Sequence, residues 1–246
     1  MKKIMVMVCM AMFLGMFLIP GGVAAFNPAH LEQLKAKNDC SDCDLGMVNL
    51  GMAKLSGANL WRTDLSWADL NGADLSGAFL RGATMLSTNL SGANLSGADM
   101  RHVELLSANL SGADFGGANL SGSGFGGANL TGASLIKAKL SGVNMTFANL
   151  SGANLSGASL SGATLPFANL TGANLTGASL SGATLPFANL SGANLTGTNL
   201  SNADLRGAKL TGTDFGGANL SKANLSNATW TDGSLCKPNS IGQCIK

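Results

Sequence analysis

Residues 151–190 read SGANLSGASLSGATLPFANL and then TGANLTGASLSGATLPFANL, so two periods are visible in one stretch. A five-residue unit repeats without interruption, and a twenty-residue unit repeats almost letter for letter. Neither the 3.6-residue period of an α-helix nor the two-residue period of a strand matches a five-residue repeat. The stretch therefore predicts a solenoid built from repeats, and not an ordinary globular domain.

The same register extends over most of the chain. Every fifth residue from Leu45 to Leu235 is Leu, Met, Phe or Trp, which makes 39 consecutive units, 32 of them centred on Leu. The residue two before the centre is Ala in 29 units, and the centre is usually followed by Ser or Thr and then Gly. Gly permits the positive φ of a tight corner between units. If the chain turns once in each unit, the large centre and the small residue point inward in every unit.

Four sides of five residues close one coil of twenty residues, which accounts for the second period. Stacked coils would hydrogen-bond as parallel strands do, about 4.8 Å apart, so almost ten coils make a rod on the order of 47 Å long. The prediction is an all-β solenoid, a quadrilateral parallel β-helix over residues 41–235, in which residue n lies beneath residue n+20.

The A(N/D)LxG signature of these units resembles the pentapeptide repeat family over residues 41–235. The resemblance implies a right-handed quadrilateral β-helix with the centre and the small residue stacked inside. It also implies a possible activity, since some cytoplasmic members resemble B-DNA in size and acidity and inhibit the topoisomerase DNA gyrase.

The first 25 residues have the three parts of a secretory signal peptide. Lys2 and Lys3 precede an apolar run over residues 4–19, and small residues end at Ala25, where we expect cleavage. A retained signal anchor is the alternative, but a run of about sixteen residues is short for a span of about 20. We therefore expect export to the periplasm or the cell exterior, or to the thylakoid lumen in a photosynthetic organism.

Both ends of the rod need a cap, because an open β-helix exposes its edges and its core. Residues 26–40 predict a short N-terminal capping helix, with Asn27 as N-cap, Pro28 at the first position and Asn38 at the end. A basic membrane-surface helix is the rival interpretation, but acidic residues offset Lys35 and Lys37. Residues 236–246 form the expected C-terminal cap, together with Trp230.

Four cysteines remain after signal cleavage, and an even number in an exported chain predicts disulfides. Cys40 and Cys43 lie about 45 Å along the rod from Cys236 and Cys244, whereas a disulfide needs Cα atoms within about 7 Å. Within one chain this leaves only Cys40–Cys43 and Cys236–Cys244. The first pair is a CxxC, which can be redox-active, but Cys43 occupies a small inward position, so a structural disulfide is favoured.

Charge and motifs exclude several classes of function. Without Lys2 and Lys3 the fifteen basic residues fall to thirteen, which equals the thirteen acidic residues, and no charged residue lies between Lys139 and Asp204. A neutral surface disfavours nucleic-acid binding. Only His30 and His102 are present, without a catalytic motif or a metal-ligand cluster around them. We expect no enzymatic activity, no cofactor and no metal.

The twenty-residue period also predicts columns of side chains on the surface. One column consists of six asparagines, which we interpret as a structural amide ladder: Asn89, Asn109, Asn129, Asn149, Asn169 and Asn189. A second column, Phe147, Phe167 and Phe187, lies on an outside corner. These aromatics either form a docking strip or stack on one another.

A third group of surface residues lies nearer the N-terminus, where Trp61, Arg81 and Arg101 share a column. Trp stacked with Arg predicts a cation–π contact, and aromatics with Arg are typical of interaction hot spots. A solvated face is the alternative. The full set of candidate partner-binding residues is Trp61, Arg62, Phe79, Arg81, Arg101, His102, Phe147, Phe167 and Phe187.

The function that the sequence favours is an exported, non-enzymatic scaffold that binds an unidentified protein partner along the rod. We expect a monomer or weak oligomer that binds no nucleic acid and, after signal cleavage, no membrane. A DNA-mimic inhibitor of a topoisomerase is disfavoured by export, by neutral charge and by the lack of a C-terminal helix for dimerisation. A binder of surface lattices such as ice is suggested by flat Ser/Thr/Asn columns, but the regular Thr pairs are missing.

Overall fold

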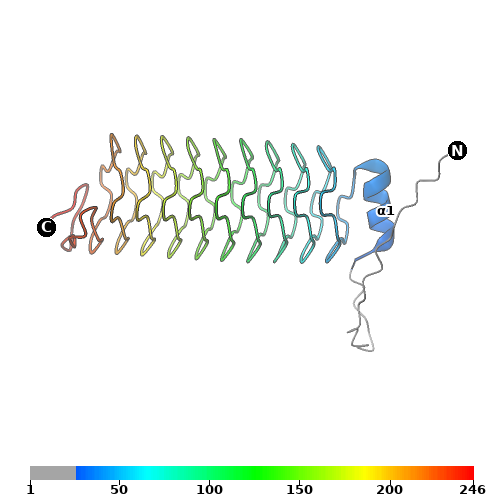
Figure 1. Ribbon diagram of the computed structural model, residues 1–246, viewed down its shortest axis with the longest axis horizontal. Helices are drawn as coiled ribbons and strands as arrows, with labels where there is room; N and C mark the ends of the chain where they lie inside the picture. Colours follow the sequence, from blue (N-terminus) through cyan, green and yellow to red (C-terminus); the bar gives the residue numbers. More distant parts are fainter. Residues whose placement is uncertain (1–25) are drawn as a thin grey trace, which may run out of the picture.

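The computed structural model describes residues 26–246, and the predicted signal peptide lies outside the described residues (Figure 1). One α-helix, α1 (Pro28–Lys37), crosses one end of a stack of coils that continues to the C-terminal tail. No helix within residues 26–246 is long and apolar enough to cross a membrane. The molecule is therefore one elongated rod, as the repeat predicts.

Parallel bridges hold each coil to the next with a spacing of twenty residues, from Asp39–Asn59 to Lys209–Thr229. The bridging residue is the one just before each apolar centre, as in Asn149–Asn169. Leu150 N donates to Asn169 O at 2.7 Å, and Asn169 N donates to Ala148 O at 2.9 Å. The four-sided coil of twenty residues is thus confirmed.

The corners depend on a left-handed backbone conformation at the second residue after each centre. Gly152 has a φ of 65° there, and the Ala153 amide then donates to Leu150 O at 3.0 Å. The side chain before the centre completes the turn, since Asn149 Oδ1 accepts from Ser151 N at 3.2 Å. The N-L-S-G-A spacing therefore encodes a tight corner in each unit.

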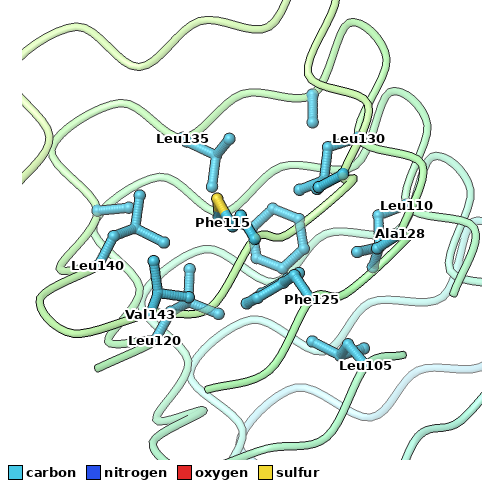
Figure 2. Close-up of a cluster of buried hydrophobic side chains, with 14 of the residues drawn as sticks. Leu105, Leu110, Phe115, Leu120, Phe125, Ala128, Leu130, Leu135, Leu140 and Val143 are labelled. Atoms are coloured by element: carbon cyan, nitrogen blue, oxygen red, sulfur yellow. The ribbon is translucent and has the colours of Figure 1, made fainter. Parts of the chain in front are cut away.

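The core is a continuous apolar column inside the coils. Every centre from Leu60 to Leu210 is 0% exposed, and Phe115 and Phe125 fill the middle of the rod (Figure 2). Where Thr or Ser replaces the inward Ala, its hydroxyl is satisfied: Thr88 Oγ1 donates to Leu65 O at 2.8 Å. Buried polar groups without partners would destabilise the stack, so these hydrogen bonds permit the substitutions.

At the N-terminal end, α1 is fixed to two of the four sides of the first coil. Asn27 caps the helix because its Oδ1 accepts from Ala29 N at 3.0 Å, and its backbone N–H donates to Asp44 O at 3.2 Å. Asn38 ends the helix at a φ of 54°, and its carbonyl accepts from Asn59 N at 3.0 Å. Leu34 is 2% exposed and belongs to the core.

The other two sides of the first coil keep an open edge. Among residues 26–246, the backbone N–H groups of Asn49 and Lys54 have no hydrogen-bond acceptor, whereas the equivalent N–H groups of the next coil donate to the coil beneath them. The helix thus covers the end of the core only in part.

The C-terminal end differs from the expectation at the last unit. Thr229 makes the last parallel bridge and then an antiparallel bridge with Leu235, which is 63% exposed and not a buried centre. The cause is a tight reversal, in which Gly233 has a φ of 85° and Trp230 N donates to Ser234 O at 2.7 Å. The ring of Trp230 stacks on Phe215, with centroids 5.2 Å apart.

Each end also carries a disulfide, in the pairing that the rod length predicts. Cys40–Cys43 has Cα atoms 5.3 Å apart, and Cys236–Cys244 has Cα atoms 5.1 Å apart. Cys43 is only 4% exposed in its inward position. A buried CxxC disulfide is shielded from attack by solvent thiols, which favours the structural interpretation.

Candidate interaction surface

Large exposed apolar side chains gather along one corner of the rod. Ten such residues lie on the coils, and six of them lie on this corner. Five of the six are separated by multiples of twenty residues, and the sixth, Leu106, is one residue away from that spacing. We call this row the apolar edge; it consists of Met47, Trp67, Leu106, Phe147, Phe167 and Phe187. The row runs along most of the rod, so a partner that follows the rod axis would meet it over several coils.

The three phenylalanines form the regular part of the apolar edge. Phe147 and Phe167 have ring centroids 5.1 Å apart, and Phe167 and Phe187 have them 5.3 Å apart, with interplanar angles of 13° and 11°. The stacking that the columns predict is therefore present. Parallel stacking of this kind contributes about 0.5–1.5 kcal/mol per pair.

The backbone of these phenylalanines is in a conformation that suits glycine. Phe147, Phe167 and Phe187 have φ values of 59°, 57° and 58°, like the glycines at most other corners. This conformation costs an L-residue roughly 1–2 kcal/mol. Burial does not offset that cost, because the three residues remain 64%, 51% and 60% exposed. Exposed aromatics on strained backbone are typical of a binding surface.

The apolar edge ends in a hollow beside Phe187. The ring lies next to Gly207, where an added Cβ would come within 2.5 Å of it. Pro186, Arg206 and Asn227 complete the lining of this hollow, which has a volume of about 350 Å³. Arg206 is held by three charge-assisted hydrogen bonds to Asp204, which also keep the pKa of that carboxyl below its usual range.

The asparagine column beside the apolar edge has a structural role. Asn109 Nδ2 donates to Asn89 Oδ1 at 3.2 Å, and Asn129 Nδ2 donates to Asn109 Oδ1 at 3.2 Å. Asn169 Nδ2 donates to Asn149 Oδ1 at 3.0 Å, but the ladder is interrupted between Asn129 and Asn149, where Asn149 Nδ2 donates to Thr131 Oγ1 at 2.9 Å, and it does not continue to Asn189. These amides link neighbouring coils, as the sequence predicts for this column.

The charged and aromatic group near the N-terminus is arranged differently from the prediction. The Arg62 guanidinium lies 4.9 Å from the centroid of the Trp61 ring, and Arg62 Nε lies 3.2 Å from Asp42 Oδ1. The cation–π contact thus forms with the chain neighbour and not with Arg81 one coil above. Backbone stacking places Trp61 beneath Arg81 but does not fix the direction of either side chain.

Arg101 of the same group is already engaged. Its Nε and Nη2 donate to the two oxygens of Asp99 at 2.8 and 2.6 Å, and this pairing holds the pKa of Asp99 below its usual range. Arg81, Phe79 and His102 are exposed around the pair. The group therefore consists of two ion pairs, the Trp61 ring beside Arg62, and three further exposed side chains.

The sequence interpretation missed half of the apolar edge. Met47, Trp67 and Leu106 are 59%, 64% and 46% exposed on the same corner as the phenylalanines. The signal was available, since Trp67 and Met47 precede Phe147 by whole multiples of twenty residues. Within residues 26–246, no three His, Cys, Asp or Glu side chains converge as metal ligands.

The sequence pattern of pentapeptide repeats matches the chain in eight copies, over residues 49–85, 87–122, 108–146, 148–186 and 188–227. The chain belongs to the pentapeptide repeat family. The solved structures that pentapeptide repeat proteins match are right-handed β-helices, in agreement with the expected architecture of the coils. No curated protein sequence matches the chain.

Two solved structures of pentapeptide repeat proteins are similar to this one. HetL from the cyanobacterium Nostoc sp. strain PCC 7120, which is involved in heterocyst differentiation regulation, is 32% identical; the match covers 85% of this chain and 99% of HetL, with a TM-score of 0.55. QnrB1, a plasmid-mediated fluoroquinolone resistance protein, is 25% identical over 73% of this chain and 90% of its own, with a TM-score of 0.46.

Proposed function

We propose that this pentapeptide repeat protein is an exported, non-enzymatic scaffold that binds a protein partner along the apolar edge. Pentapeptide repeat proteins are generally non-enzymatic structural or interaction proteins. The observation that carries the proposal is the stack of Phe147, Phe167 and Phe187, which is more than half exposed on strained backbone. Neither the core nor the coil-to-coil hydrogen bonds require these rings.

The surface around the phenylalanines sets the chemistry of the partner. Their coils lie between Lys139 and Asp204, where no residue is charged, and the Arg206 beside Phe187 is already paired with Asp204. A charged partner surface would lose its hydration there without gaining an ion pair, which is unfavourable. The partner that fits presents an uncharged apolar strip with hydrogen-bonding groups at its rim.

Export and capping belong to the same proposal. The two disulfides support an oxidising compartment such as the periplasm, because disulfides persist there and are rare in reducing cytosol. The contacts of α1 support a capping role, since Leu34 joins the core and the ends of the helix form hydrogen bonds with the first coil.

DNA mimicry stays disfavoured, because the mature chain has equal numbers of acidic and basic residues.

The test exploits the identity of the corner residue. Gly occupies the equivalent corner position in most units, so replacing the three phenylalanines by Gly removes the rings without changing the backbone that the fold requires. Partners would be captured by chemical cross-linking in the exported compartment of the native host and compared between wild type and the triple variant. We expect a specific cross-linked partner with wild type and its loss with the variant.

A matched control removes apolar and charged groups from another corner. Ile136→Ser with Lys137→Gly creates the common Ser-Gly corner on a different side of the rod. This control should capture the partner as wild type does. Equal capture by the triple Gly variant, with its melting curve retained, would refute binding along the apolar edge.

A further inference from the structure

A pocket opens between α1 and the first coil, away from the apolar edge. It has a volume of about 420 Å³, within the range of roughly 300–1,000 Å³ that is typical of small-molecule sites. Its floor is apolar and its rim carries two ammonium groups. The floor consists of the buried or partly buried Leu34, Leu50, Ala53 and Leu55, and the rim of the exposed Lys35, Lys54 and Asn38, whose side-chain amide donates to Ser56 O at 3.0 Å.

The pocket exists because α1 bonds only two sides of the first coil. On the uncovered sides solvent reaches the core: Leu50 is 8% and Leu55 is 6% exposed, whereas all centres from Leu60 to Leu210 are 0% exposed. Ala53 is likewise only partly buried, in contrast to the other inward alanines up to Ala208. A hydrocarbon group in this pocket would continue the apolar column of the core by one more layer.

The rim offers hydrogen-bond donors to an anion. Lys54 forms no ion pair within residues 26–246, and its backbone N–H has no acceptor in the same part of the chain. Lys35 Nζ lies 2.9 Å from Glu32 Oε1, but both side chains are largely exposed, and exposed pairs of this kind are weak. A ligand anion can therefore recruit Lys35 in addition to Lys54.

We propose that this pocket binds a small amphiphilic carboxylate, with its hydrocarbon part against Leu34, Leu50 and Leu55 and its carboxylate at Lys54 and Lys35. A carboxylate accepts several hydrogen bonds at once, and those from ammonium groups are charge-assisted. A neutral amphiphile would fill the floor but leave the cationic rim unused. A compact anion without a tail would use the rim but leave the floor exposed to water.

The site is independent of the apolar edge, so either proposal can fail alone. The experiment uses the mature, disulfide-bonded protein and dansyl-aminoundecanoic acid as a fluorescent probe, with decanoate and decanol as competitors. We expect saturable probe fluorescence, displacement by decanoate, and weaker displacement by decanol. Absence of saturable binding, or equal displacement by the acid and the alcohol, would overturn the proposal.

Variants assign the rim and the floor separately. Lys35→Met with Lys54→Met keeps the aliphatic stems and should weaken decanoate binding about tenfold or more, as expected for lost hydrogen bonds to a charged group. Decanol binding should stay unchanged in this variant. The control Lys137→Met, on a distant coil, should bind decanoate as wild type does; an equal loss there would show nonspecific attraction.

Filling the pocket is the complementary test. Ala53→Met places a longer apolar side chain where the floor is open, and Met adapts its shape to irregular space. We expect this variant to melt at or above the wild-type temperature and to lose the probe signal. A folded Ala53→Met protein that binds the probe with wild-type affinity would place the ligand elsewhere and contradict the proposal.

Discussion

The aromatic stack requires glycine at position 207, because a side chain there would clash with the ring of Phe187. An added Cβ at this position would lie 2.5 and 2.6 Å from two carbons of the Phe187 ring. Contacts this short force the ring to move. We therefore predict that Gly207→Ala destabilises the rod by displacing Phe187 from Phe167, in addition to the cost at its own backbone.

The magnitude follows from a comparison with Gly177, which lies at a corner with nearly the same φ, 65° against 64°, and has nothing within 4 Å of an added Cβ. Gly177→Ala should lower the free energy of unfolding by about 1 kcal/mol, the cost of an L-residue in the left-handed region. Gly207→Ala adds the lost stacking, about 0.5–1.5 kcal/mol, and an off-rotamer ring, about 0.5–1.5 kcal/mol. We expect a total of about 2–4 kcal/mol.

Urea unfolding followed by circular dichroism measures both variants in the same background. The decisive comparison repeats them in a Phe187→Gly protein, where no ring lies next to residue 207. In that background Gly207→Ala and Gly177→Ala should have equal effects. If the two substitutions are already equal in the wild-type background, or if their difference persists without the ring, the account of the stack is wrong.

Three further predictions concern the core, the surface ion pairs and the cysteines. Leu155→Asp buries a carboxylate at a fully enclosed centre, so the cooperative melting transition should be lost or strongly lowered, whereas Asn154→Asp beside it should melt within a few degrees of wild type. Asp99→Asn should lower the urea midpoint at pH 7. The difference should shrink as the pH falls below the unfolded pKa of about 4, because a carboxyl whose pKa is depressed by Arg101 stabilises the fold above its unfolded pKa and loses this contribution as pH falls through the folded value. Thiol titration of the native mature protein should detect none of the four cysteines as free; two or more reactive thiols would contradict the disulfide pairing.

The repeat made most of the fold predictable, because each unit has the same inward residues and the same corner. The inward position of Leu155, the corner at Gly152 and the stacking of Phe167 on Phe147 all follow from the periods of five and twenty. The end of the repeat was not predictable in this way. Leu235 keeps the register of the sequence, yet the turn at Gly233 reverses the chain one unit earlier.

The surface was less predictable than the core, because a column fixes backbone positions and leaves side chains several directions. Trp61 and Arg81 share a column, but Trp61 contacts Arg62, whose guanidinium also pairs with Asp42. Partial coverage of the first coil by α1 was equally hidden. It depends on which backbone groups the ends of a ten-residue helix reach, and the periodicity does not encode that.

The twenty-residue coil also constrains how this gene can change in length. Inserting one unit of five residues would keep every later Leu in the core, yet it would turn each later side chain to the next corner and separate the phenylalanines from Trp67 and Leu106. Inserting four units would restore every corner and lengthen the rod by about 4.8 Å. Insertions and deletions of twenty residues should therefore be tolerated in evolution. Insertion of a single unit would preserve the fold but change which side chains share a corner, and so would alter the surface that a partner contacts.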